Sequence, residues 1–311
     1  MAHDRGIRLL TYNVKMLPEV VKLFERPILR PGGFWEHPPH AFRDRERAAT
    51  LAQSITAMNP AWDLICLQEL FSGSVQRTFE RALAADYRCI GRLGGSRFPR
   101  LGHSGLFLAT RLPILEHRFE PYRLAGGTDR LCDKGVLHVV LDAKERWPET
   151  PYLHVFATHA QAWPEHVATR LRQLSQAREF LTRRLREAGP DDRHAAVLCG
   201  DFNVIAEHPE AVQPTEEYHL LRRVLGRARD LYRELHPSRH GSTWDSVENP
   251  HMTGDPPGKL ERLDYVFALD SVDHFGPSLR RLVCRHAEVL KLRDGIRHLS
   301  DHFALETLLE T

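Results

Sequence analysis

The chain has 311 residues, of which 42% are hydrophobic and 27% are charged. These values are those of an ordinary globular protein, and the length suits one large α/β domain or two small ones. The formal net charge is only +2, which indicates neither a nucleic-acid binder nor an acidic tail.

The N-terminal segment and the cysteines bear on the compartment. The chain begins with no basic segment followed by an apolar stretch of signal-peptide length, and no apolar run approaches the length of a membrane span. The five cysteines form no CxxC pair, so we expect neither a disulfide framework nor a zinc site. The sequence as written predicts a soluble, cytoplasmic protein. A secreted protein whose leader was removed before residue 1 is the open alternative.

Apolar runs that predict β-strands recur along the whole chain, and helical patterns lie between them. Several runs are continuous rather than alternating, which is typical of strands covered on both faces. The predicted strands lie at residues 7–14, 62–70, 104–110, 135–143, 152–160, 195–204, 262–269 and 302–309. The predicted helices lie at residues 43–58, 72–83, 166–188 and 215–225, the last with Thr215 as its N-cap and Gly226 as its stop.

Two stretches, residues 27–39 and 249–258, are rich in proline and glycine. They are predicted to be long loops, which in a compact domain are often functional. No repeat, low-complexity tract or convincing linker occurs. The alternation of strands and helices therefore predicts a single layered α/β domain over residues 1–311.

Polar side chains gather near the ends of the predicted strands. In AAVLCGDFNV, residues 195–204, Asp201 and Asn203 follow Gly200 and point the same way, because strand side chains two apart share a face. Glycine, aspartate and asparagine are also turn formers, so this stretch alone does not separate a site from a turn. Five further segments carry Asn13, Gln68 and Glu69, His159, Asp264, and Asp301 with His302. Six such segments are hard to explain as turns and predict an active site.

The residue types at these strand ends indicate a reaction. Glu69 with Asn13 offers the oxygen ligands that Mg²⁺ accepts, and Mn²⁺ or Co²⁺ would be accepted as well. The two histidines offer a general base and a proton donor or anion stabiliser. Asp201 and Asn203 can orient a nucleophile or hydrogen-bond a developing charge. Such a set suits metal-assisted attack of water on a phosphate ester.

The motifs TYNV, QE, ATH, GDFNV, RLDYVF and SDH, in this order from residue 11 to residue 302, resemble the endonuclease/exonuclease/phosphatase superfamily. Three further segments, DKG, HAQ and STWD, are similar to those of bacterial neutral sphingomyelinases, which are phospholipase C-type phosphodiesterases. The resemblance implies the deoxyribonuclease I-like fold. This fold is an α/β (in some schemes α+β), four-layer α/β/β/α sandwich of two packed mixed sheets flanked by helices.

The resemblance also implies a role for each matched position of the catalytic centre. Glu69 is expected to be the main Mg²⁺ ligand with Asn13 beside it, and Asp301 to support His302 or a second metal position. His302 is expected to be the general base. Asp264 is expected to orient His302, and His159 to be a second catalytic imidazole. Asp201 and Asn203 are expected to position water and phosphate.

A second group of residues is expected to bind the substrate. Lys134, beside Asp133 in the DKG segment, could meet a phosphate, and Gln161 belongs to the HAQ segment. Arg262 is expected to border the pocket because it lies two residues before Asp264. Trp244 borders the site in the related proteins, but a simple core role for it is equally acceptable.

The partners follow from the same resemblance. We expect a monomer that acts on a phospholipid or another phosphodiester. Residues 276–298 stand where the secreted relatives carry a membrane-inserting aromatic hairpin, but here they are basic and hold no Trp or Tyr. We interpret them as a solvated strand pair, with peripheral contact to an anionic bilayer as the alternative. Residues 170–186, which are rich in arginine, are interpreted as a solvated helix face.

Three alternative functions stay open. A Mg²⁺-dependent endonuclease or abasic-site nuclease would use the same catalytic set and would bind nucleic acid. An inositol-phosphate phosphatase is disfavoured because the chain reads ERLDYV where such relatives carry a WCDR-like segment. A catalytically inactive binding protein is disfavoured because every expected catalytic position is filled.

Overall fold

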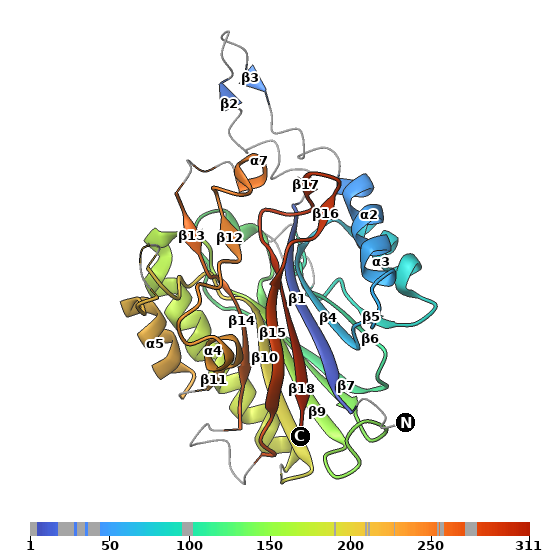
Figure 1. Ribbon diagram of the computed structural model, residues 1–311. Coiled ribbons are helices and arrows are strands. Elements are labelled where there is room, and N and C mark those ends of the chain that lie inside the picture. Colours follow the sequence, from blue (N-terminus) through green and yellow to red (C-terminus); the bar gives the residue numbers. More distant parts are fainter. Residues whose placement is uncertain are drawn as a thin grey trace.

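The computed structural model describes residues 5–17, 28–29, 35–36, 44–94, 102–189, 191–208, 210, 212–226, 228–253, 255, 258–270 and 279–311. Most of these residues belong to two mixed β-sheets and to the helices that cover them (Figure 1).

The first sheet has six strands in the order β15-β18-β1-β4-β6-β5. They are β1 (Ile7–Met16), β4 (Leu64–Leu70), β5 (Arg88–Ile90), β6 (Phe107–Thr110), β15 (Val283–Leu290) and β18 (Ala304–Glu310). At its centre, β1 pairs in parallel with β4 and antiparallel with β18. The C-terminal ends of β1 and β4 therefore lie side by side at one edge of the sheet.

The second sheet has six strands in the order β11-β14-β10-β9-β8-β7. They are β7 (Ile114–Pro121), β8 (Gly135–Asp142), β9 (Tyr152–His159), β10 (His194–Asp201), β11 (Arg229–Asp230) and β14 (Asp264–Ala268). Here β10 pairs in parallel with β9 and antiparallel with β14. This register sets Asp201 opposite His159 on one side and opposite Asp264 on the other.

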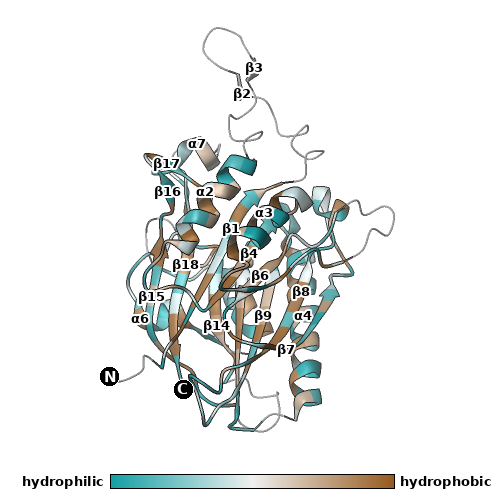
Figure 2. Cartoon of the chain, turned by 90° about the vertical axis from the view of Figure 1, so that its right-hand side faces the viewer, coloured by the Kyte–Doolittle hydropathy of each residue, from teal (hydrophilic) through white to brown (hydrophobic). Residues whose placement is uncertain are grey.

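Helices cover the outer faces of both sheets. Figure 1 shows α2 (Asp44–Thr56) and α3 (Gly73–Leu83) on one side, α4 (Val167–Ala188) and α5 (Glu216–Val224) on the other, and the sheets between them. Three buried apolar clusters fill the spaces between these four layers. In the view of Figure 2 the strands carry most of the hydrophobic colour, as expected when both faces of a sheet are covered. The predicted four-layer α/β/β/α sandwich is confirmed.

Short elements complete the chain between these layers. They are β2 (Ile28–Leu29), β3 (Trp35–Glu36), η1 (Gly127–Leu131), η2 (Pro164–His166), α6 (Leu231–Leu235), β12 (Trp244–Asp245), α7 (Pro250–Thr253), β13 (Leu260–Glu261), β16 (Arg293–Asp294) and β17 (Arg297–His298). The predicted loop 249–258 contains α7, and residues 254, 256 and 257 lie outside the described part. In the predicted loop 27–39 only β2 and β3 are described.

The predicted strands and helices are all present, with ends that differ by a few residues. The cap of α5 is as predicted: Thr215 Oγ1 accepts a hydrogen bond from the Tyr218 amide at 3.1 Å, and Gly226 has a φ of 63°. In the two sheets, the strands that were not predicted are β7, a half-exposed edge strand with several charged residues, and β5 and β11, which are only three and two residues long. β15 lies in the stretch that was interpreted as a strand pair. Within residues 276–298, β15 pairs with β18 of the large sheet, and residues 276–278 lie outside the described part. No helix in the described ranges is both long and apolar enough to cross a bilayer.

Candidate active site

The strand pairing brings the polar strand ends of both sheets together. Asn13 lies at the end of β1, beside β4, which ends with Glu69 and Leu70. Asp201 ends β10 and His159 ends β9. The side chain of Asn13 connects the sheets, because its Nδ2 donates to Glu69 Oε1 at 3.0 Å and to Asp201 Oδ2 at 2.8 Å.

Two residues of the centre adopt backbone conformations that non-glycine residues rarely occupy. Glu69 has a φ of 58° and Asn203 a φ of 52°. The Asn203 turn is held because its amide donates to Asp201 Oδ1 at 2.8 Å and its Nδ2 donates to the Ala160 carbonyl at 3.2 Å. Such conformations persist only where the surroundings impose them, and they concentrate at functional sites.

Asp264, the first residue of β14, forms a buried pair with His302, which lies just before β18. His302 Nδ1 lies 2.8 Å from Asp264 Oδ2, and His302 Nε2 lies 3.8 Å from Asp201 Oδ2. Burial opposes a charge on the imidazole, but the carboxylates of Asp264 and Asp201 outweigh burial and raise the pKa of His302 to about 10. The ring therefore carries a proton in this arrangement. It can act as a base only when the charge of the neighbouring carboxylates is neutralised.

His159 is held as a neutral imidazole. Lys134 Nζ donates to His159 Nε2 at 3.0 Å, to Asp129 Oδ2 at 2.8 Å and to the Ala160 carbonyl at 3.2 Å. Burial lowers the pKa of His159 far below its usual value, and the charges of Lys134 and His302 lower it further. Because Nε2 accepts from the lysine, the ring proton resides on Nδ1. This buried Nδ1 has no hydrogen-bond partner among the described residues.

Two overlapping groups of side chains could hold a metal ion. The ligand atoms of Glu69, His159 and Asp201 all lie within 4.8 Å of one another, as do those of Asp201, Asp264 and His302. Burial raises the pKa of Asp201 to about 7, and burial and the nearby Asp301 raise that of Glu69. A divalent cation would relieve the cost of burying these carboxylates together. The predominance of oxygen donors fits a hard ion such as Mg²⁺.

Asp301 is oriented differently from the other predicted ligands. Its Oδ2 lies 3.0 Å from Lys15 Nζ, and its Oδ1 accepts from Ser300 Oγ at 3.2 Å. Burial alone would raise the pKa of Asp301, but Lys15 and His302 outweigh burial and lower it. The carboxylate is therefore paired with a cation and belongs to neither of the two groups that could hold a metal.

Arg262 lies away from this centre, which corrects the expectation that it borders the pocket. Its side chain is fully buried, and its NH2 lies 2.6 Å from Glu207 Oε1 and 2.9 Å from Asp230 Oδ2. The guanidinium also lies 4.7 Å from the centre of the Tyr265 ring. Arg262 and Asp264 are two apart in sequence, but a bound guanidinium between two carboxylates leaves no cation directed at a substrate.

The other predicted substrate residues are placed as follows. Trp244 packs edge-on against His302, with ring centres 5.1 Å apart. Gln161 is fully buried, accepts from the Gly126 amide at 2.6 Å and donates to the Gly126 carbonyl at 3.3 Å, so its side chain holds a loop. Asp133 is buried beside Gly94, since a Cβ on Gly94 would lie 2.8 Å from the Asp133 Cβ.

The sequence reasoning missed three residues that support the centre. Asp129 pairs with Lys134 from five positions earlier in the same loop, and its place in GGTDRLCDKG was the available signal. Ser300 Oγ donates to the Asn13 carbonyl at 2.7 Å. Arg47 of α2 donates to the carbonyls of Val14 at 3.1 Å and Leu299 at 2.7 Å. Its pair with Asp44 three residues earlier is ordinary in a helix, and its other acceptors are backbone atoms from distant segments, so no sequence signal marks Arg47.

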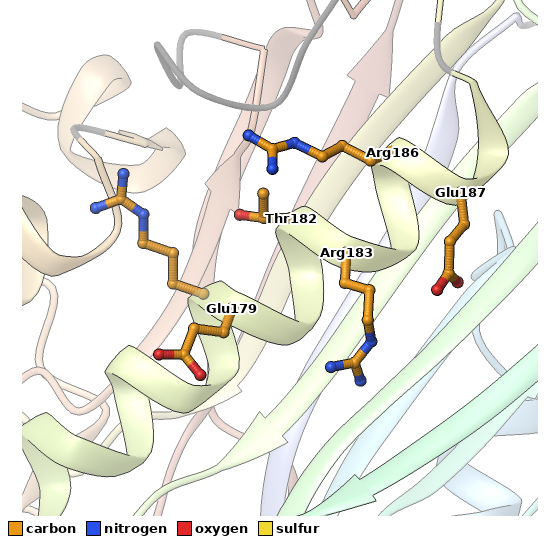
Figure 3. Close-up of a pocket in the computed structure, with 6 residues that line it drawn as sticks. Glu179, Thr182, Arg183, Arg186 and Glu187 are labelled. Atoms are coloured by element: carbon orange, nitrogen blue, oxygen red, sulfur yellow. The ribbon is translucent and has the colours of Figure 1, made fainter.

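A shallow depression along α4 is separate from this chemistry. It is lined by Arg178, Glu179, Thr182, Arg183, Arg186 and Glu187 (Figure 3). Arg183 pairs with Glu120, and Arg178 donates to the Val224 carbonyl at 3.0 Å. This surface is the solvated helix face that was expected for residues 170–186. Arg170 is the exception, because it is buried and pairs with Glu217 at 2.6 Å.

The chain is similar to known proteins over most of its length. Residues 10–302 match the Endonuclease/Exonuclease/phosphatase family. Sphingomyelin phosphodiesterase 5 of Danio rerio is 31% identical over 182 residues, which are 54% of this chain and 33% of that protein. Sphingomyelinase C of Leptospira interrogans is 25% identical over 297 residues, which are 89% of this chain and 46% of that protein. The chain thus spans less than half the length of these two relatives.

Solved structures show the same fold. The crystal structure of beta toxin 275-280 from Staphylococcus aureus superimposes with a TM-score of 0.71 at 21% sequence identity. The match covers 97% of this chain and 99% of that chain. It extends over both sheets and their covering helices, and so agrees with the deoxyribonuclease I-like architecture predicted from the motifs.

Proposed function

Because this chain belongs to the endonuclease/exonuclease/phosphatase family, we propose that it is a metal-dependent phosphodiesterase of the sphingomyelinase C type. It would release phosphocholine from sphingomyelin or a related phospholipid. The observation that carries the proposal is the convergence of two sheets on one centre, where Asn13 bridges Glu69 and Asp201 beside His159 and the His302–Asp264 pair.

Two observations support a lipid phosphodiester over other esters. Two relatives of this chain are named as sphingomyelin-cleaving enzymes, and the alignment with one of them covers 89% of this chain. The DKG segment provides a buried lysine, and Lys134 lies against His159 in the centre itself. A buried ammonium interacts strongly with a phosphate because the surrounding dielectric is low.

The proposed reaction is attack of water on the phosphorus atom. Once the charge of the neighbouring carboxylates is neutralised, His302 Nε2 takes the proton of the water, while Asp264 holds Nδ1 and stabilises the imidazolium that forms. Asp201 and Asn203 orient the water and the phosphate oxygens. His159 stays neutral and holds Lys134 in place by accepting from it through Nε2. The buried charge of Lys134 would stabilise the negative charge that develops on the phosphate and the leaving alkoxide.

The residues present fit a hard divalent cation, with Glu69 as its main ligand and Asn13 beside it. When bound, such an ion would neutralise the phosphate oxygens and stabilise the charge of the transition state. The proposed ion is Mg²⁺, with Mn²⁺ or Co²⁺ as substitutes.

The test is release of phosphocholine from sphingomyelin in mixed micelles with Mg²⁺. Phosphatidylcholine and plasmid DNA are assayed in parallel, and the His302→Ala variant controls for contaminating hydrolases. Release from sphingomyelin that EDTA abolishes is the expected result. Nicking of DNA without cleavage of either lipid would overturn the lipid assignment and move the enzyme to the nuclease branch.

A further inference from the structure

A tryptophan lies in solvent four residues beyond the catalytic imidazole. Trp163 follows the strand that ends at His159, and its side chain is 61% exposed. Its φ of 73° is rare for a bulky residue. Folding gains little from a strained residue whose indole stays in water, so the conformation suggests a function outside the core.

The backbone of Trp163 is fixed by a buried arginine. Arg170, which is 1% exposed, donates from NH1 to the Gln161 carbonyl at 2.9 Å and to the Trp163 carbonyl at 3.0 Å. Arg170 is itself fixed by Glu217, whose Oε1 lies 2.6 Å from its NH2. The indole is therefore displayed by a buried scaffold rather than by a free loop.

A second exposed apolar side chain belongs to the adjacent loop. Leu124 is 45% exposed. Gln173 connects the two loops, because it donates to the Leu124 carbonyl at 2.7 Å and accepts from the Gln161 amide at 2.7 Å. The Gln161 side chain adds two hydrogen bonds to Gly126. Leu124 and Trp163 are thus carried by two loops that are tied together at the His159 end of β9.

Two basic side chains belong to the Leu124 loop, because Arg123 precedes Leu124 and Arg130 Nε donates to the Ala125 carbonyl at 3.1 Å. Arg123 and Arg130 are exposed, and neither forms an ion pair with another residue in the described part of the chain. One exposed acid, Glu165, lies on the same loop as Trp163. Two arginines and a leucine on one loop, with a tryptophan on the loop tied to it, match the headgroup region of a bilayer, where indoles sit at the interface and arginines meet lipid phosphates.

We propose that Trp163 and Leu124, together with Arg123 and Arg130, form a docking surface for a phospholipid bilayer that carries anionic lipid. The surface, defined by these four residues, is called the interfacial loop pair. This proposal rests on the proposed function. The two loops adjoin His159 and Lys134, so docking through them would bring lipid headgroups to the catalytic centre. Occupation by a partner protein or by a second copy of the chain is the competing outcome.

The experiment measures binding separately from turnover. The full chain, in EDTA, is sedimented with vesicles of phosphatidylcholine and sphingomyelin, with and without phosphatidylserine. Trp163→Ala is expected to weaken binding about tenfold or more, through loss of buried apolar area. Leu124→Ala is expected to weaken it less. Arg123→Gln and Arg130→Gln are each expected to weaken binding to the phosphatidylserine vesicles about fivefold.

A matched control exists on β7. Leu115 is an exposed leucine, 51% accessible, at the opposite end of that strand from Leu124, about 20 Å away. Leu115→Ala is expected to bind like the wild type. Trp163→Phe is expected to keep most of the binding, but to lose the blue shift of tryptophan emission that vesicles cause.

Activity on a water-soluble phosphodiester, measured with Mg²⁺, distinguishes the two proposals. Unchanged hydrolysis by Trp163→Ala together with weakened vesicle binding supports the docking surface. Three results would overturn the docking surface and leave the hydrolase assignment intact. They are vesicle binding at the wild-type level by both Trp163→Ala and Leu124→Ala, a loss of binding in Leu115→Ala as large as in these variants, and no vesicle binding by the wild type. Loss of soluble activity in Trp163→Ala would overturn it in favour of a role inside the centre. Vesicle binding without hydrolysis of any phosphodiester would overturn the proposed function alone.

Discussion

At the scale of single residues, His302 and His159 have opposite electrostatic environments although both are buried. His302 faces the carboxylates of Asp264 and Asp201, which raise its pKa to about 10. His159 faces Lys134, which together with burial lowers its pKa. One imidazole is therefore suited to carry a proton and the other to stay neutral, as expected where two histidines have different roles in one reaction.

Replacement of His302 tests its role as the base. His302→Ala is expected to lower kcat by about 10²–10⁴-fold, because water then loses its proton acceptor. Alanine leaves Asp264 buried without its partner, so His302→Gln serves as a second variant that can still meet this carboxylate. His117→Ala, at an exposed histidine, is the control. Retention of most activity by both His302 variants, measured on folded protein, would contradict the mechanism.

At the scale of elements, the pairing of β9 and β10 at the active-site end depends on a glycine. Gly200 has a φ of 136°, and a Cβ there would lie 1.9 Å from the Thr158 carbonyl oxygen. Only glycine allows Asp201 to stand beside His159 in this register. The glycine that precedes the acid in CGDFN is thus a requirement of strand pairing.

Gly200→Ala is therefore expected to lower the free energy of unfolding by about 3 kcal/mol or more, through backbone strain and a clash with β9. Gly258→Ala is the matched control, because Gly258 has a φ of 118° but no atom within 4 Å of its Cβ position. Urea denaturation measures both. Similar losses in the two variants would mean that backbone strain alone, and not the approach of β9, accounts for the effect.

Three histidines cross β8, β9 and β10 on the side that faces α4. Arg184 Nε donates to His138 Nδ1 at 3.3 Å, so His138 Nε2 donates to His154 Nδ1 at 3.1 Å and His154 Nε2 donates to His194 Nδ1 at 2.9 Å. Burial, the neighbouring histidine and Arg184 lower the pKa of His138 to about 2 and that of His154 to about 3. The row therefore folds in the neutral form.

Acid should destabilise the protein through this row. The pKa of an unfolded histidine is about 6.5, so between about pH 6.5 and pH 3 the unfolded chain binds more protons than the folded one. Stability present above pH 6.5 is lost as the pH falls, by up to about 1.4 kcal/mol per pH unit for each histidine. His154→Gln should reduce this slope in urea denaturation at several pH values. The exposed His117→Gln should not, and an unchanged slope in His154→Gln would contradict the account.

At the scale of the whole molecule, the active centre joins the two sheets. Asn13 and Glu69 belong to the first sheet, and His159 and Asp201 to the second. A cation held between them would add a link across the central apolar layer. Any ligand that binds only the folded state raises its stability by mass action.

Mg²⁺ is therefore expected to raise the free energy of unfolding, by about 2.7 kcal/mol at roughly 100 times its Kd. Glu69→Gln should require a higher Mg²⁺ concentration for the same effect, and for activity, because the proposed main ligand loses its charge. Glu145→Gln, at an exposed glutamate, should behave like the wild type. Thermal melts with Mg²⁺ and with EDTA provide the measurement, and equal responses in all three proteins would argue against Glu69 as a ligand.

Much of the architecture was predictable because the apolar pattern of a strand shows which of its faces are covered. Continuous apolar runs such as residues 135–143 and 195–204 indicated strands covered on both faces, and β8 and β10 are such strands. β7 escaped prediction because an edge strand without a single buried residue lacks this signal. The side chains at strand ends were identified by type, since carboxylates, amides and imidazoles are conspicuous after apolar residues.

Residue identity and local periodicity are enough to tell which chemical groups stand at the strand ends, and in which order. The direction in which each group points depends on the tertiary fold. It pairs Asp301 with Lys15, buries Arg262 between Glu207 and Asp230, and sets Asp129 against Lys134. These pairings depend on which buried charges meet across segments distant in sequence. A buried charge takes the partner that packing supplies, and no local pattern records that choice.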